Sequence, residues 1–218
     1  MSAHAVFFDL DGTLTDPRTG ITECIRYALT KMGRVAPAVD ELLWCIGPPL
    51  PKTFATLLAT DDAALVASAV AIYRERFGTV GLFENEVYPG IPEAVARVRT
   101  AGAATYVMTS KPHVYARRIV EHFELAALFD RVYGSELDGT RVEKGDLIAH
   151  ALTEERLDPA RVVMIGDREH DAIGARRNGL RVIGVTYGYG SETELRAHGA
   201  EAIAATPAEI PSLVTRLL

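Results

Sequence analysis

The chain has 218 residues, 48% of them hydrophobic and 24% charged, which is typical of a globular protein that buries a substantial core. Its formal net charge of -6 argues against a nucleic-acid polymer as partner, because such partners normally require a basic surface. Cys24 and Cys45 show neither metal-ligand spacing nor a disulfide framework, which favours a reducing compartment. Asp9 and Asp11 interrupt any signal-peptide core, and the longest apolar run, Ala63–Ile72, is too short to cross a bilayer. We therefore expect a cytoplasmic protein with no membrane partner, either a monomer or a weak homodimer.

The first predicted element is Val6–Phe8, a continuous apolar run typical of a strand buried on both faces of a parallel sheet. It ends at Asp9 and Asp11, and Gly12 follows, where the backbone can turn tightly. Open α/β sheets bind their ligands just beyond the carboxyl ends of such strands. Two neighbouring carboxylates repel each other, and a divalent cation removes that conflict. Hard oxygen ligands in a partly open site favour Mg²⁺.

Two other interpretations of this acidic pair are weaker. A solvated Asp-Gly turn explains Gly12 but not two acids placed directly after a fully apolar strand. A calcium-binding EF-hand loop needs glycine at its sixth position and glutamate at its twelfth. Counted from Asp9, Gly12 is fourth and Gly20 is twelfth, so that pattern does not fit.

Helical patterns dominate the next segment. Apolar residues recur every three or four positions from Ile21 to Met32, which predicts an amphipathic helix. Asp61 or Asp62 is expected to cap a later helix that runs to about Gly78. Shorter helices are predicted at Asp40–Ile46 and Pro51–Ala59. Residues 17–86 contain no strand pattern, so we predict a helical cap domain there, inserted into a core domain formed by residues 1–16 and 87–218.

From Tyr88 onwards, strand and helix patterns alternate as in βαβ units. The predicted strands are Thr105–Thr109, Arg131–Tyr133, Val162–Ile165 and Val182–Val185. The predicted helices are Ile91–Thr100, Pro112–Phe123, Lys144–Arg156 and Asp171–Asn178. Two late helices carry start signals, a capping box at Ser191 with Glu194 and Thr206-Pro207 at a first turn. The pattern predicts an α/β fold, a doubly wound (Rossmann-like) parallel sheet of about five strands with an inserted all-helical cap.

Three further segments place polar residues at strand ends or at the helices that follow. Thr109 and Ser110 could offer a hydroxyl and helix-start N–H groups to a phosphate, although such residues are more often simple caps. Lys144 at a helix start opposes the helix dipole and needs a compensating anion. Asp167 and Asp171 follow an apolar strand, as Asp9 does, and could complete the metal site. Each motif alone is weak, but their joint order on successive strand ends is specific.

With these motifs in hand, the sequence resembles the haloacid dehalogenase superfamily of phosphohydrolases, and within it the phosphoglycolate-phosphatase-like group with a helical cap. Asp9-Leu10-Asp11-Gly12-Thr13-Leu14-Thr15-Asp16 matches the first family motif, Thr109 the second and Lys144 the third. Gly166-Asp167 through Asp171 matches the fourth. The resemblance covers essentially the whole chain, and its first motif is the most specific.

The resemblance implies a mechanism as well as a fold. Asp9 is implied to attack phosphorus and form an aspartyl-phosphate, with Asp11 as general acid and then general base. Thr109 and Lys144 are implied to hold the phosphoryl oxygens. The implied Mg²⁺ ligands are Asp9, the backbone carbonyl of Asp11, Asp167 and Asp171, the last either directly or as support.

The cap is implied to select the substrate. Gly47-Pro48-Pro49-Leu50-Pro51-Lys52 is a stiff stretch that faces the cleft in similar proteins, so Gly47 and Lys52 join Thr109, Ser110 and Lys144 as expected substrate-binding residues. The function expected from the sequence is Mg²⁺-dependent hydrolysis of a small phosphorylated metabolite, as in a phosphoglycolate phosphatase. A 5′-nucleotidase and a phosphomutase remain open alternatives. A non-catalytic phosphate-sensing module is the least favoured, and the second acid, Asp11, argues against a dehalogenase.

Overall fold

The computed structural model describes residues 4–218. This part of the chain divides into two compact units, one formed by Pro17–Glu86 and the other by the described residues on either side of it. No single helix among the described residues is long and apolar enough to cross a membrane. Leu50–Leu58 and Ala63–Gly81 reach that length and composition only as a pair bent by 115°.

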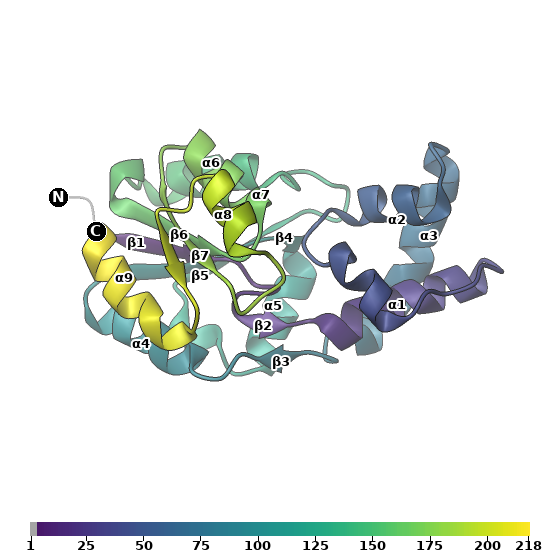
Figure 1. Ribbon diagram of the computed structural model, residues 1–218, viewed down its shortest axis with the longest axis horizontal. Helices are drawn as coiled ribbons and strands as arrows, with labels where there is room; N and C mark the ends of the chain where they lie inside the picture. The colour runs from purple at the N-terminus through teal and green to yellow at the C-terminus, as the bar shows by residue number, and fades with distance from the viewer. Residues whose placement is uncertain (1–3) are drawn as a thin grey trace. The chain divides into compact units, whose positions relative to one another are not determined.

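The larger unit is built on a six-stranded parallel sheet with the strand order β5-β4-β1-β6-β7-β8 (Figure 1). The strands are β1 (Ala5–Phe8), β4 (Ala104–Pro112), β5 (Arg131–Ser135), β6 (Val162–Gly166), β7 (Arg181–Val185) and β8 (Ala202–Ala204). A separate two-stranded sheet pairs β2 (Thr15–Asp16) with β3 (Glu86–Val87). The central β1 has a neighbour on each side, so the polar residues that follow it lie at the middle of the sheet edge.

The expected five strands are corrected to six. Within this sheet the strand that was not predicted is β8, which pairs with β7 through Ile183 and Ala202; the short β2 and β3 of the separate sheet were not predicted either. The sequence of β8, Ala-Ile-Ala, is short, and alanine is depleted in strands. Nothing local therefore marks it as a strand, and it forms because β7 offers an open edge.

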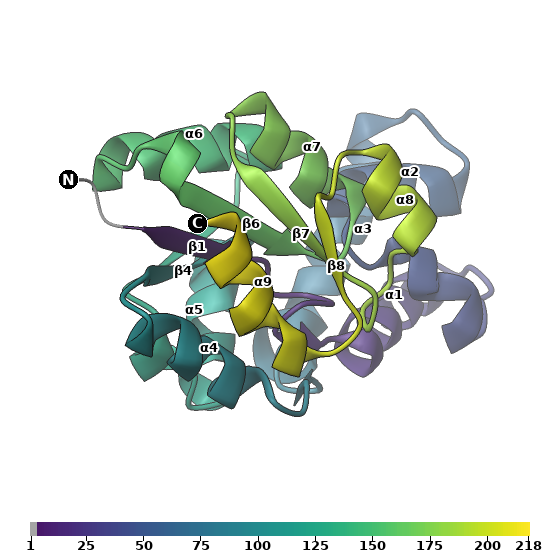
Figure 2. The same ribbon diagram turned by 60° about the vertical axis from the view of Figure 1, so that its left-hand side comes forward.

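Helices cover both faces of this sheet, and Figure 2 shows α6 and α7 on one face with α4, α5 and α9 on the other. The helices of this unit are α4 (Ile91–Thr100), α5 (His113–His122), α6 (Lys144–Glu155), α7 (Glu169–Arg177), α8 (Glu192–Ala197) and α9 (Ile210–Leu217). Side chains of β1 alternate between the two layers. Phe7 meets Tyr106 edge to face at 5.5 Å, and Phe8 meets Phe129 at 5.9 Å on the opposite side. Each fully buried phenylalanine contributes about 2 kcal/mol of hydrophobic stabilisation.

The smaller unit consists mainly of helices. It contains α1 (Arg18–Lys31), a 3₁₀ helix (Val39–Cys45), α2 (Leu50–Leu58), α3 (Ala63–Arg76) and a π turn (Phe77–Gly81). The expected cap of α3 is confirmed at Asp62, whose carboxylate accepts the N–H groups of Ala64 and Leu65 at 2.9 and 3.2 Å. Phe77 stacks on Tyr73 at 5.2 Å and so ties the π turn to α3.

The two late start signals are each realised in part. Ser191 caps α8 by accepting the N–H of Glu194 at 3.1 Å. The Glu194 carboxylate, however, accepts N–H groups of Arg168 and Glu169 and not that of Ser191, so the box is half formed. The hydroxyl of Thr206 donates to Glu209, and a 3₁₀ turn precedes α9 there.

Candidate active site

The site is built where three neighbouring strands end. Asp9 follows β1, and its N–H donates to the carbonyl of Ile165 in β6 at 2.9 Å, which extends the pairing of these strands by one residue. Asp167 follows β6, and Asp171 lies in the first turn of α7. Carboxylate oxygens of these three buried acids lie within 4.8 Å of one another. The parallel pairing of β1 with β6 thus brings Asp9 close to Asp167 and Asp171, which follow it by more than 150 residues in the sequence.

Lys144 lies among these acids. Its side chain is 4% exposed, and Nζ is 2.7 Å from Asp9 Oδ1 and 2.8 Å from Asp171 Oδ1. It also donates to the backbone carbonyl of Met108 in β4 at 2.7 Å. The anion that a lysine at a helix start needs is therefore supplied by two carboxylates. The arrangement also ties the start of α6 to three other elements.

The charges of the cluster do not balance. Three carboxylates face one ammonium group, which leaves an excess of two negative charges among Asp9, Asp167, Asp171 and Lys144. Burial raises the pKa of Asp9 to about 6 against the opposing effect of Lys144. Burial likewise raises the pKa of Asp167 well above its ordinary value, and the nearby Asp171 and Asp9 carboxylates add to this. Such shifts show that the metal-free site disfavours its own charges.

The residues fit a hard divalent cation. Asp167 Oδ2 accepts the N–H of Tyr189 at 2.8 Å, but Asp167 Oδ1 is buried and has no hydrogen-bond partner among the described residues. A buried, unsatisfied carboxylate oxygen is costly. An all-oxygen donor set with an excess charge of about −2 is the chemistry that Mg²⁺ prefers. Asp9, Asp167 and Asp171 are therefore the side chains that would hold it.

The side chain of Asp11 lies outside this trio. Its Oδ1 accepts a charge-assisted hydrogen bond from Lys111 Nζ at 2.8 Å. Burial raises the pKa of Asp11, and Lys111 opposes the rise. Lys111 was not predicted as a site residue; its position two residues after Thr109, on the same strand end, was the available signal.

Thr109 and Ser110 lie near the end of β4, shortly before α5 begins. That they hold a phosphate stays a prediction. Pro112 was expected to begin the helix, but α5 starts at His113, so Ser110 and Lys111 are still extended. Proline fixes its own backbone and disfavours a helical conformation in the residue before it. Thr109 Oγ1 accepts the N–H of Lys111 at 3.2 Å.

Gly47 and Lys52 belong to the helical unit. Gly47 has a φ of 105° just before α2, and Lys52 is exposed in the first turn of that helix. Their contact with a substrate stays a prediction.

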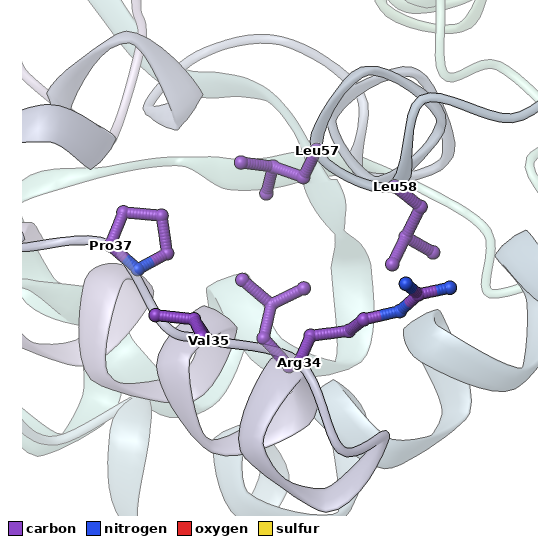
Figure 3. Close-up of a pocket in the computed structure, with 6 residues that line it drawn as sticks. Arg34, Val35, Pro37, Leu57 and Leu58 are labelled. Carbon is purple, nitrogen blue, oxygen red and sulfur yellow. The ribbon is translucent and has the colours of Figure 1, made fainter.

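The same unit contains a pocket of about 180 Å³ (Figure 3). Its lining is Leu29, Arg34, Val35, Pro37, Leu57 and Leu58. This lining has no acid or nucleophile, so it does not share the chemistry of the acidic cluster.

The loop after β7 also supports the cluster, which the sequence analysis did not anticipate. Tyr189 donates its N–H to the Asp167 carboxylate, and the Tyr189 hydroxyl donates to the Asp16 carboxylate. A Cβ at Gly190 would come within 1.8 Å of the Asp167 carbonyl oxygen. Only glycine therefore permits this approach. The segment Gly188–Gly190 therefore holds the Asp167 carboxylate in place. Its position shortly after β7 was the one sequence feature that pointed to such a role.

Gly12 offers a direct test of how tightly the cluster is packed. Its φ is 81°, and a Cβ there would lie 2.2 Å from Asp167 Oδ2. We expect Gly12→Ala to lower the free energy of unfolding by ~2–4 kcal/mol, because backbone strain and a displaced carboxylate add together. Urea unfolding and the thermal shift produced by MgCl₂ would measure both effects.

The control for this substitution is Gly102→Ala. Gly102 has a φ of 93° with nothing within 4 Å of the added Cβ. The loss of unfolding free energy in Gly102→Ala therefore measures the cost of backbone strain alone. The thermal shift produced by MgCl₂ should be unchanged in this variant. Equal losses of stability in the two variants would contradict the proposed crowding of Asp167.

Fold and site together define a class of protein, a doubly wound α/β protein with an acidic cluster at the carboxyl ends of its strands. The sequence matches the haloacid dehalogenase-like hydrolase family over residues 6–185, and the chain belongs to this family. It is 51% identical to a 5′-nucleotidase of Pseudomonas aeruginosa over 88% of this chain and 87% of that protein. The chain is accordingly an enzyme of the phosphatase type.

Other relatives carry different names. A phosphoglycolate phosphatase of Caulobacter vibrioides is 28% identical, with 100% of this chain and 93% of that protein covered. The tyrosine-protein kinase PtkA of Mycobacterium tuberculosis is 39% identical, but the match spans 87% of this chain and only 64% of that longer protein. Among solved structures, a predicted phosphatase from Clostridium acetobutylicum has a TM-score of 0.94 and 39% identity. It covers 99% of this chain and 100% of its own.

Proposed function

We propose that this enzyme is a Mg²⁺-dependent phosphomonoesterase that acts on a small phosphorylated metabolite through an aspartyl-phosphate. The observation that carries the proposal is the buried trio of Asp9, Asp167 and Asp171 around Lys144. Bound Mg²⁺ would neutralise the repulsion between carboxylates and phosphate and stabilise the transferring group. An acidic site at a sheet edge, in a chain of formal net charge -6, needs such a local cation to accept an anionic ester.

The reaction divides into two displacements. In the first, a carboxylate oxygen of Asp9 attacks phosphorus, the ester bond breaks, and Asp11 gives a proton to the leaving oxygen. In the second, water attacks phosphorus, the bond to Asp9 breaks, and Asp11 takes the proton of the water. Lys144 and Thr109 support the charge that develops on the phosphoryl oxygens.

For the substrate, we place nucleoside 5′-monophosphates first. The support is the relative named 5′-nucleotidase, which is 51% identical, against 28% for the phosphoglycolate phosphatase. This reverses the order that the sequence alone favoured. A phosphomutase and a non-catalytic phosphate-sensing module remain as alternatives, and the cytoplasm as location stays a prediction.

A substrate panel would test the proposal. We expect MgCl₂-dependent release of phosphate from nucleoside 5′-monophosphates with kcat/KM of about 10⁴ M⁻¹s⁻¹ or more, at least ~10-fold above that for 2-phosphoglycolate, and no release in excess EDTA. Inorganic phosphate is the readout, with p-nitrophenyl phosphate as the general substrate. No release from any ester would contradict the proposal. Isomerisation of a sugar phosphate without free phosphate would establish a mutase instead.

A further inference from the structure

The Lys111–Asp11 contact is an ion pair that the acidic trio does not need. Lys111 Nζ and Asp11 Oδ1 are 2.8 Å apart, and the two side chains are only 7% and 12% exposed. Burying a charged pair is costly, and its mutual attraction roughly offsets the desolvation of both ions. A contact of this kind contributes little net stability. The ion pair does fix the orientation of each side chain. Its effect on function is therefore expected through the orientation of the Asp11 carboxylate.

The backbone that carries Lys111 is fixed from both sides. The pairing of β4 with β5 shifts in register between Thr109 and Pro112, an irregularity that re-aims the side chains of a strand. Thr109 Oγ1 accepts the N–H of Lys111 at 3.2 Å. Ser135 in β5 donates its hydroxyl hydrogen to the carbonyl of Ser110 at 2.8 Å. The segment that presents Lys111 is therefore held in one conformation before any substrate arrives.

We propose that Lys111 is a positioning residue for Asp11 in the second displacement, the hydrolysis of the aspartyl-phosphate; the inference rests on the proposed function. Lys111 occupies Oδ1 of Asp11, which leaves Oδ2 to accept the proton of the attacking water. The water oxygen bonds to phosphorus, the bond between phosphorus and the Asp9 oxygen breaks, and inorganic phosphate leaves. Asp9 regains its carboxylate, and the proton resides on Asp11 until it passes to solvent.

The substrate that isolates this step is p-nitrophenyl phosphate. Its nitrophenolate leaves without needing a proton, so the first displacement proceeds without the acid role of Asp11 and only the second depends on its orientation. Acid quench followed by intact-protein mass spectrometry counts the phosphorylated enzyme during turnover. Release of nitrophenol gives kcat and KM.

We expect Lys111→Met to lower steady-state kcat by ~10²–10³-fold, the usual contribution of a positioned general base. KM should fall in parallel, so that kcat/KM, which reports the first displacement, is little changed. The phosphorylated fraction of the enzyme should rise to near one, because formation of the intermediate continues while its hydrolysis slows. Lys111→Arg should restore part of the rate. The matched control is Lys31→Met, which removes an exposed lysine paired with Glu75 in the helical unit and should leave both readouts unchanged.

A double-mutant cycle with Asp11→Asn distinguishes an effect of Lys111 through Asp11 from a general loss of structure. If Lys111 acts through Asp11, Lys111→Met should have no further effect on kcat in an Asp11→Asn background. That pair of substitutions also leaves no unpaired buried charge, so the double variant should fold even where Lys111→Met alone does not. Additive losses in the cycle would overturn the inference.

The remaining outcomes are equally decisive. A rise in KM with unchanged kcat would make Lys111 a substrate-binding residue and overturn the positioning role. A fall in kcat with a lower phosphorylated fraction would place the defect in the first displacement and overturn it too. If the unaltered enzyme hydrolyses the ester but never forms a phosphoenzyme, the proposed covalent mechanism itself fails, which is a result distinct from either of these.

Discussion

Asp9→Asn should reduce turnover of every phosphomonoester by ~10⁴–10⁶-fold, the scale seen when a covalent nucleophile is removed. An amide oxygen is a poor nucleophile and cannot yield the aspartyl-phosphate that water then hydrolyses. The fold should be retained, because asparagine is isosteric with aspartate and lies beside the well-packed β1. Initial rates with MgCl₂ and acid-quench mass spectrometry would show the loss of both turnover and phosphoenzyme.

The stability of this variant carries a second, independent expectation. Replacing one of three buried carboxylates by a neutral amide lowers the repulsion in the metal-free cluster. The melting temperature without metal should therefore equal or exceed that of the unaltered enzyme, while the shift caused by MgCl₂ should shrink. Asp61→Asn, at an exposed position in the helical unit, is the matched control and should change neither. Activity in Asp9→Asn close to normal would contradict its assignment as nucleophile.

Lys144→Met should be the most destabilising single substitution in the site. It removes the ammonium group that faces Asp9 and Asp171, and it removes a donor from the Met108 carbonyl. Removing one partner of a buried ion pair costs ~3–5 kcal/mol, or roughly 6–20 °C in melting temperature for a chain of this size. Activity should fall by ~10²–10³-fold through lost stabilisation of the phosphoryl oxygens. Thermal unfolding in EDTA and initial rates in MgCl₂ measure the two effects.

The stability deficit of Lys144→Met should depend on pH in one direction. The folded-state pKa of Asp9 is already raised to about 6, and removing Lys144 would raise it further. A carboxyl group whose pKa is raised on folding favours the folded state below its unfolded pKa, and this contribution is lost as pH rises through the folded pKa. The deficit relative to the unaltered enzyme should therefore shrink between pH 8 and pH 5. A deficit that grows on acidification would contradict the assigned ion pairs.

The long core elements could be predicted because their sequences repeat the same physical pattern. Val6–Phe8 and Val162–Ile165 are apolar runs bounded by polar turns, and the structure places both as buried neighbouring strands. β8 was missed because its strand character comes from pairing and not from composition. The helix expected to run to about Gly78 changes to a π turn at Phe77, where the stacking of Phe77 on Tyr73 overrides local propensity.

Site residues could be predicted from the sequence only where the local pattern itself marked them, such as a carboxylate directly after an apolar strand. Asp9, Asp167 and Asp171 stand out because carboxylates follow apolar strands. Lys111 did not, since a lysine two residues after Thr109 resembles an ordinary surface residue until Asp11 is placed beside it. The Tyr189 clamp depends on the spatial adjacency of β6 and β7, which no local pattern encodes.

The central position of β1 determines how activity should be lost when the protein unfolds. Its backbone amides are enclosed by β4 and β6, so local fraying, which begins at edges and termini, cannot expose them. Hydrogen exchange along Ala5–Phe8 should therefore require opening of the entire sheet. Asp9, the proposed nucleophile, thus follows a strand whose amides should exchange only when the sheet opens as a whole, and heat or denaturant should abolish catalysis only when the whole larger unit unfolds.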